Sequence, residues 1–513
     1  MKKGITLLLT VMLVISIFAG CSNKTDTDTA GGKQKEGQST TGSTASNGNT
    51  TSDEAVKLVY VVPGDAPKDL ERGLKNVNDK LLADDVGVQI EVKFIAWDAW
   101  DQKLNIMLST GEEFDMFHVM NDRVSLANYA SRGALTDLAE IINQYGLAIK
   151  EKNPESAMKS GQVDGKQYGI PAYWVESALN HQATLRTDIL KKYNLEIPST
   201  FEELTKAYET VMKNWEGNQK PYFPMCGTEQ VGGYFFNSDN NYVLYDKMFY
   251  VNQDGTVKNY FETDAFKESC NKARLWYEKG LINPDVLTTT KDQMNNQLSS
   301  GDWLVHAGTI GDITGIKKNY PDITIDDFVW LDFDTKTPEI RPYGTRNMQA
   351  VPLSSKHPEA AVKFINWLYS SQDNFDLFIY GTEGTDYKKL ADRNYEAITD
   401  VTSGAAPYSF PTWMIGNINY EYTSANAPKI TNEHLYQLDK NAVEGVASKF
   451  TFDGSKLQTQ LADVNTIIAS NITPMASGVV DYDSNIEETL KLLKDAGIDD
   501  LVDEFNKQLG ESR

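Results

Sequence analysis

"VKLVYVVPGDAPKDLERGLKNVNDKLLADDVGVQIEVKFIAW", residues 56–97, holds two apolar strands with one amphipathic helix between them. The apolar runs at 56–62 and 87–97 are typical of buried strands, whereas the apolar residues at 70–82 recur at helical spacing. A strand, a helix and a second strand in this order form a right-handed parallel crossover. This stretch therefore predicts an open α/β sheet.

The same alternation continues downstream. Asp98 can cap a second helix, and "FDMFHVM" at 114–120 is a third apolar strand. A helix is also predicted over 264–279. Thr200 with Glu203, and Ser484 with Glu487, have the spacing of a helix-capping box. A chain of 513 residues is long enough for at least two lobes, each with its own core.

The N-terminus has the layout of an export signal. Two lysines precede an apolar run at 5–18, and Ala19 and Gly20 lead to Cys21. The apolar run is shorter than the ~20 residues that a membrane-spanning helix needs. We expect residues 1–20 to be a lipoprotein signal peptide and Cys21 to carry a lipid such as palmitate; an N-terminal anchor helix is the alternative. Residues 21–55 are small and polar, which predicts a flexible tether.

The composition argues against several classes of function. A formal charge of −23 does not suit nucleic-acid binding. The chain has no spacing of cysteine or histidine that would indicate a metal site, and we expect no metal and no cofactor. It also has no familiar catalytic motif, so we expect no enzymatic activity. Cys226 and Cys270 are predicted either to form one disulfide or to be buried thiols.

Aromatic residues are frequent, with 25 Tyr and 9 Trp, and several lie beside turn residues rather than within helical stripes. A ring at the end of a strand can present a flat apolar face to solvent. Sugars have flat C–H faces that stack on such rings, while polar side chains bond their hydroxyl groups. The pattern favours carbohydrate binding, although each ring could instead pack in a core.

Several longer stretches together resemble a known family. They are "FDMFHVMNDRVSLANYASRGALTDL" (114–138), "DGKQYGIPAYW" (164–174), "LKKYNLEIPSTFEELTKAYE" (190–209), "YEKGLINPDV" (277–286), "NMQAVPLSSKHPEAAVKFINWLYSSQDNFDLFIYGTEGTDY" (347–387) and "TPMASGVVDYDS" (473–484). With the lipobox and the tether, they resemble the extracellular solute-binding lipoproteins of carbohydrate ABC importers. The resemblance is to the large family 1 branch of Gram-positive bacteria and covers residues 56–513.

The resemblance implies a two-lobed α/β fold of the periplasmic-binding-protein type (type 2), with the ligand in a cleft that closes by hinge motion. It implies a first lobe of 56–171 plus 343–380 and a second of 172–342 plus 381–513. Connections between the lobes are then expected near Pro171, Gly344 and Gly381. The implied partners are an oligosaccharide, the permease subunits of an ABC importer, and the membrane through Cys21. A monomer on the outer face of the cell membrane is expected.

The resemblance also implies a set of ligand-binding residues. Asp122 matches an acidic residue that binds sugar hydroxyls, Tyr173 and Trp174 match the segment lining the cleft, and Trp413 approximately matches a second-lobe ring. Residues near the expected connections complete the set: Trp303, Tyr343, Arg346, Asn347, Glu383 and Asp386. Arg346 and Arg186 could pair with a ligand carboxylate or form structural ion pairs.

Two other functions stay open at this point. The same fold can receive a peptide or another solute. A surface glycoside hydrolase could carry its two acids anywhere in so acidic a chain.

Overall fold

The first 54 residues lie outside the part of the chain described by the structure, a computed structural model. The described residues are 55–121, 123–175, 182–227, 236, 241–333, 337–391, 393–399, 406–431 and 441–511. The predicted signal peptide, Cys21 and most of the predicted tether therefore fall outside them, as does Asp122.

The opening stretch forms the predicted crossover. β1 (Val56–Pro63) and β2 (Val88–Ile95) pair in parallel along their whole lengths, and α1 (Leu70–Ala83) connects them. β3 (Met116–Met120) pairs in parallel with the other side of β1. Two distant strands then extend this first sheet: β14 (Asn347–Ala350) lies antiparallel between β3 and β6 (Gly169–Pro171). The strand order is β2-β1-β3-β14-β6.

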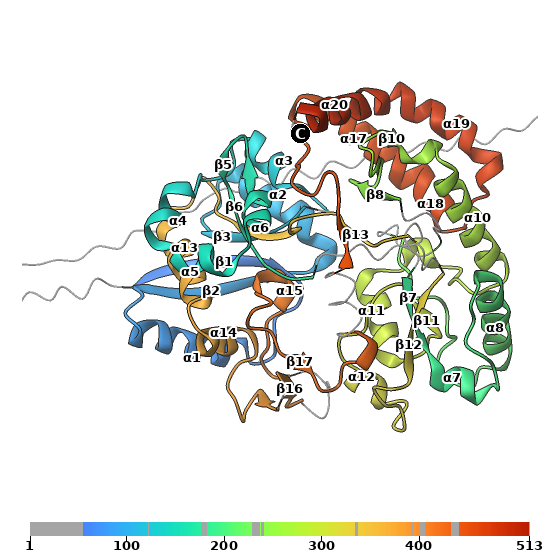
Figure 1. Ribbon diagram of the computed structural model, residues 1–513, viewed down its shortest axis with the longest axis horizontal. Helices are drawn as coiled ribbons and strands as arrows, with labels where there is room; N and C mark the ends of the chain where they lie inside the picture. The colour runs from blue at the N-terminus through green and yellow to red at the C-terminus, as the bar shows by residue number, and fades with distance from the viewer. Residues whose placement is uncertain are drawn as a thin grey trace, which may run out of the picture. The chain divides into compact units, whose positions relative to one another are not determined.

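Helices cover both faces of the first sheet, which is why its strands are apolar on both sides (Figure 1). One face packs on the helices α1, α4 (Ala139–Tyr145), α5 (Leu147–Lys152), α13 (Pro358–Leu368) and α14 (Gln372–Ile379). The other face packs on α2 (Trp100–Thr110) and α3 (Leu126–Ser131). Beside β6 lie α6 (Glu155–Ser160) and the hairpin of β4 (Gln162–Val163) and β5 (Lys166–Gln167).

A second sheet has the strand order β11-β7-β12, with both neighbours antiparallel to β7. Its strands are β7 (Gln182–Arg186), β11 (Val305–His306) and β12 (Phe328–Asp332). One face packs on α7 (Thr187–Lys192), α8 (Phe201–Asn214) and α10 (Asp264–Glu278). The other face packs on a smaller core, around which lie α11 (Lys291–Ser300) and α12 (Thr314–Lys317).

The C-terminal helices pack on a third, antiparallel sheet of β8 (Tyr242–Tyr245), β9 (Phe249–Asn252) and β10 (Val257–Asn259). The helices are α17 (Gln458–Ile467), α18 (Thr473–Ala476), α19 (Tyr482–Asp495) and α20 (Ile498–Glu511). α10 also contributes to this core, so it joins the second and third sheets into one lobe. β13 (Ile340–Arg341) pairs in parallel with β18 (Val443–Glu444) beside it. The molecule is thus a two-lobed α/β protein.

The contacts of residues 381–424 differ from the expected lobe boundaries. Tyr387, Phe410, Met414 and Tyr420 pack in the core of the first sheet. The small sheet of β15 (Tyr387–Lys389), β16 (Asn394–Ala397) and β17 (Thr423–Ser424) follows α14, and α15 (Thr412–Ile415) lies on β14. The Ile313 amide of the second lobe then donates to the Asn426 carbonyl (3.0 Å). We therefore propose that the third connection lies near Ser424 rather than Gly381, and that 381–424 belongs to the first lobe.

Some local expectations were wrong. Asp98 lies inside a short 3₁₀ turn (Trp97–Ala99) and caps no helix. Asp481, not Ser484, caps α19. The Thr200 hydroxyl does cap α8, but the Glu203 carboxylate accepts from the Ser199 amide instead of closing the box. Cys226 and Cys270 are buried thiols that are not joined in a disulfide, which confirms the second of the two alternatives.

No helix among the described residues has the length and apolar character needed to cross a membrane.

Candidate functional site

Three segments leave the first sheet at one end of its strands, around Met120, Pro171 and Asn347. This end is called here the first-sheet edge. β3 and β6 end there and β14 begins there, because β14 runs antiparallel to both, with Asn347 opposite Met120 and Met348 opposite Pro171. Backbone hydrogen bonds bind the segments to one another just beyond the strands. The Asn121 amide donates to the Arg346 carbonyl (2.8 Å), and the Ala172 amide donates to the Asn347 carbonyl (2.9 Å). Side chains from distant parts of the sequence therefore meet at this edge.

Arg346 connects the aromatic residues at the edge. Its guanidinium carbon lies 5.8 Å from the ring centre of Trp174 and 6.0 Å from that of Tyr343. Tyr343 is buried and packs edge-on against Tyr245 of β8, at 5.3 Å between ring centres. Trp174 and Arg346 are both half-buried. The structure thus brings together three of the predicted site residues.

A second aromatic group lies on the first lobe. Trp413 of α15 stacks on Trp97, with ring centres 5.8 Å apart, and meets the buried His118 edge-on at 5.3 Å. His118 is oriented by Asn347, whose Oδ1 lies 3.1 Å from its Nε2. Both tryptophans are half-buried, and Arg123 lies over the Trp97 ring at 5.9 Å.

Tyr173 links this group to the first connection. Its amide donates to the Gly416 carbonyl (3.1 Å), and its own carbonyl accepts from the Ile418 amide (2.8 Å). The segment after α15 is therefore fixed beside Tyr173 and Trp174. The edge carries rings and cations, which can stack on a ligand and donate hydrogen bonds to it.

The carboxyl group of Glu421 lies beside Gly416, which accepts the hydrogen bond from the Tyr173 amide. A Cβ added to Gly416 would lie 2.9 Å from Oε1 of Glu421, and this oxygen is buried without a hydrogen-bond partner. Burial raises the pKa of Glu421 to about 7, and the nearby Arg393 opposes the rise only in part. On the second lobe, burial lowers the pKa of His306 to about 3, with a smaller contribution from Lys291, so this imidazole is neutral. Within the described ranges, no group of three histidine, cysteine or acidic residues could hold a metal ion.

More than half of the chain matches a known family. The family model described as bacterial extracellular solute-binding protein matches residues 68–375. The chain belongs to this family. A second model, described as a domain of unknown function, matches residues 446–511 of this solute-binding protein. This range begins just after β18 and includes the C-terminal helices α17 to α20.

Similar proteins include a carbohydrate ABC transporter substrate-binding protein of Streptococcus pneumoniae serotype 4. It is 25% identical over 472 residues, which cover 90% of this solute-binding protein and 91% of that relative. The polygalacturonan/rhamnogalacturonan-binding protein YtcQ of Bacillus subtilis is 22% identical over 410 residues, covering 77% and 76% of the two chains. Among solved structures, the N-glycan transport solute-binding protein NgtS of S. pneumoniae, in complex with Man1GlcNAc, has a TM-score of 0.72. It is 20% identical and covers 89% of this chain and 99% of its own. The fold similarity thus extends over both lobes.

Several predicted site residues of this solute-binding protein have structural roles instead. Trp303 is fully buried and donates to the Leu298 carbonyl (3.0 Å), so it cannot present its ring. Asp386 is buried and accepts from Arg72 (3.1 Å) and from the Thr382 amide (2.9 Å). Glu383 is exposed and lies 3.9 Å from Lys389 on the small sheet after α14, rather than beside the described residues of the edge. Trp413 was expected on the second lobe and lies on the first.

Trp97 was missed by the sequence analysis. It follows β2 directly in "FIAW", so a ring immediately beyond a strand was the signal that could have found it. Asn347 stays at the edge, where it orients His118.

Proposed function

We propose that this solute-binding protein captures an oligosaccharide at the first-sheet edge and delivers it to the permease of an ABC importer. One observation carries the proposal: the half-buried rings of Trp97, Tyr173, Trp174 and Trp413 gather where the connections between the lobes begin. Rings of this kind stack on sugar faces at about 1 kcal/mol each. The similar proteins, a carbohydrate ABC transporter substrate-binding protein and an N-glycan transport solute-binding protein, support a carbohydrate ligand and an ABC transporter.

The proposal includes the location of the protein. Cleavage before Cys21 and attachment of a lipid to its thiol would keep the two lobes, as a monomer, at the outer face of the cell membrane. The similarity to the Bacillus subtilis lipoprotein LipO supports the lipid anchor. The long polar segment after Cys21 would let the lobes reach the permease.

A glycan panel tests the ligand class. The purified full chain is heated with neutral manno-, fructo- and malto-oligosaccharides, with oligogalacturonides, and with peptides. A ligand at 100 times its Kd adds about 2.7 kcal/mol to the free energy of unfolding, so one glycan series is expected to raise the Tm. Stabilisation by peptides alone would contradict a carbohydrate ligand.

Trp174→Ala tests the site with whichever glycan raises the Tm. Loss of one stacked ring is expected to weaken binding about fivefold, measured by calorimetry. Trp215→Ala is the matched control, because Trp215 lies beyond α8 and donates to the Gln219 carbonyl (2.6 Å), away from the first-sheet edge. If Trp174→Ala and the unchanged protein bound the glycan with equal affinity, the binding site would have to lie away from Trp174.

A further inference from the structure

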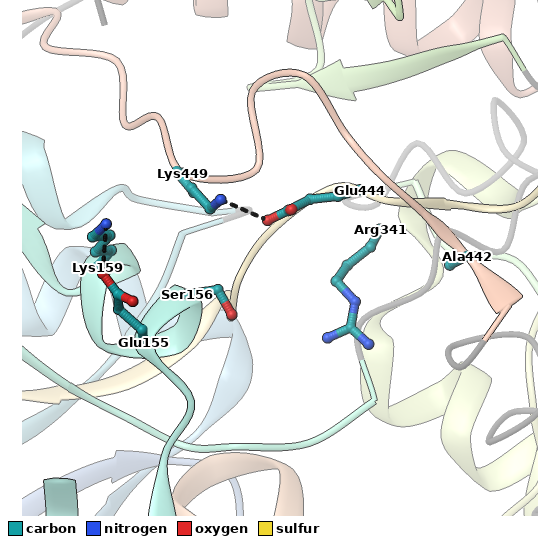
Figure 2. Close-up of a pocket in the computed structure, with 7 residues that line it drawn as sticks. All are labelled: Glu155, Ser156, Lys159, Arg341, Ala442, Glu444 and Lys449. Atoms are coloured by element: carbon teal, nitrogen blue, oxygen red, sulfur yellow. Dashed lines mark ion pairs between the residues drawn. The ribbon is translucent and has the colours of Figure 1, made fainter. Parts of the chain in front are cut away.

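A polar cavity of about 520 Å³ lies between the lobes, beside the second connection (Figure 2). On the first lobe, α6 contributes Glu155, Ser156 and Lys159. On the second lobe, the residues lining it are Arg341, Ala442, Glu444 and Lys449. None of the described residues that line this cavity is aromatic, so its described lining differs from the first-sheet edge.

Each wall of the cavity carries an ion pair of its own. Glu155 and Lys159 of α6 are 2.7 Å apart, and Glu444 and Lys449 are 3.4 Å apart. Figure 2 shows the Arg341 guanidinium directed into the space between the two walls. The pairs have the same composition, one acid and one lysine, so an exchange of partners across the cavity would leave no charge unpaired.

The two walls already influence each other. Lys159 is the main cause of the lowered pKa of Glu155, through its hydrogen bond, and the more distant Lys449 of the other lobe lowers it further. The charges of the two lobes are therefore within electrostatic reach in the present arrangement.

Both walls are also attached to the second connection. The Gly344 amide donates to the Ser448 carbonyl (3.0 Å), and the Thr345 amide donates to the Ser160 hydroxyl (3.1 Å). A Cβ at Gly344 would lie 2.3 Å from that hydroxyl oxygen and 2.5 Å from the Ser156 carbonyl oxygen. Both walls are therefore hydrogen-bonded to neighbouring residues of one closely packed connection. A rotation of one lobe about this connection changes the distance between the two walls.

We propose that Glu155 pairs with Lys449, and Lys159 with Glu444, across this cavity in a second arrangement of the lobes. The inference rests on the proposed function, because ligand capture requires lobe motion. The four side chains are about half exposed or more, so salt screens their attraction and each pair contributes little alone. Such pairs set the balance between two lobe arrangements and do not lock either one.

Charge reversal tests the pairing without any ligand. In the full chain at low ionic strength, Glu155→Lys and Lys449→Glu are each expected to lower the Tm by about 1 °C, because each places like charges together. The double variant is expected to recover most of the combined loss, and 1 M salt is expected to abolish the recovery.

The control for the cycle combines Glu155→Lys with Lys75→Glu. Lys75 is an exposed lysine on α1 that pairs with Asp79 of its own helix, so the effects of these two changes should add. Additive effects of Glu155→Lys and Lys449→Glu would overturn the proposal, since pairs confined to each lobe predict no recovery.

A cross-link tests the approach of the two walls. A Glu–Lys ion pair spans a larger Cα separation than the about 4.4–6.8 Å of a disulfide, so direct oxidation is too strict a test. Glu155→Cys with Lys449→Cys should instead be joined by a thiol-reactive bifunctional cross-linker about as long as a Glu–Lys ion pair if the walls approach each other. Mass spectrometry of the peptides identifies the bond, and Lys75→Cys with Lys449→Cys is the negative control. Absence of the 155–449 cross-link would overturn the proposal. Neither measurement uses a sugar, so a failed glycan panel would leave both results interpretable.

Discussion

Arg186 shows how the second lobe uses a cation inside its core. The side chain is fully buried, its Nε donates to Asp188 (3.0 Å), and it also bonds the Gly301 carbonyl. The guanidinium lies 4.3 Å from the ring centre of Tyr320 and 5.9 Å from that of Trp303. Of the two roles left open for Arg186, the structural ion pair is the one found.

Arg186→Met is therefore expected to cost about 3–5 kcal/mol of unfolding free energy, because Asp188 and the Gly301 carbonyl lose their partner. Denaturant unfolding measures the loss. Arg132→Met, at an exposed position on the first lobe, is the control and should change the free energy little. A loss below 1 kcal/mol would show that the core tolerates the missing cation.

Glu421 predicts a pH dependence of stability. Its pKa is about 7 in the folded protein against an ordinary 4.5, so the folded state holds this proton more tightly than the unfolded state does. Stability from this group is therefore present below pH 4.5 and is lost as the pH rises to about 7. Glu421→Gln should be more stable than the unchanged protein at pH 8, by about 3 kcal/mol, and within about 1 kcal/mol of it at pH 5. The same difference in unfolding free energy between Glu421→Gln and the unchanged protein at pH 5 and at pH 8 would contradict a raised pKa of Glu421.

The rings show the limit of sequence reasoning at this scale. Trp303 and Trp413 both lie beside turn residues, yet Trp303 is fully buried and Trp413 is half-buried at the first-sheet edge. Neighbouring residues predict that a ring is near a chain reversal. They do not tell which elements pack over it, because those elements come from distant parts of the chain.

Among the elements, the second connection is sterically restricted at Gly344. Gly344 has walls on both sides, Ser156 and Ser160 on α6 and the Ser448 carbonyl on the other lobe. A side chain here has to displace backbone, which a packed interior resists.

Gly344→Ala is expected to lower the unfolding free energy by about 1–3 kcal/mol and to raise amide hydrogen exchange over 341–346. Gly311→Ala is the matched control, since a Cβ there would meet nothing within 4 Å. If both variants had the same exchange and stability, the close approach at Gly344 would carry no energetic weight.

Elements with strong local patterns were predicted well. β1, α1, β2 and β3 follow the apolar spacing of 56–120, and α10 begins at the predicted Asp264. The caps of α2 and α19 were predicted wrongly. Asp98 lies inside the 3₁₀ turn before α2, which begins after Ala99 without a side-chain cap. At α19 the Asp481 carboxylate, three residues before Ser484, is the group that caps the helix. We propose a third connection near Ser424 where the sequence suggested Gly381, because nothing local distinguishes the loops of the first lobe from a segment that leaves it.

At the scale of the whole molecule, the proposed anchor at Cys21 sets where the lobes work. Cys21→Ser is expected to move the protein from the membrane fraction to the medium of a Gram-positive host, because the lipid has no attachment point. Immunoblots of the two fractions measure the shift. Ser22→Ala, one residue further on, is the control and should stay with the membrane. Retention of Cys21→Ser at the membrane would favour the alternative, an uncleaved N-terminal helix.

The order of the strands in the first sheet has a consequence for biosynthesis. β14 fills the gap between β3 and β6, yet the ribosome makes it only after β7, β8, β9, β10, β11 and β12. Until then, β3 and β6 each have an exposed edge that can pair wrongly. The N-terminal half of a nascent chain thus cannot finish folding while it is being made. Ribosome-bound chains arrested before Asn347 should remain protease-sensitive and bind chaperones, whereas chains that extend past Ile379 should not.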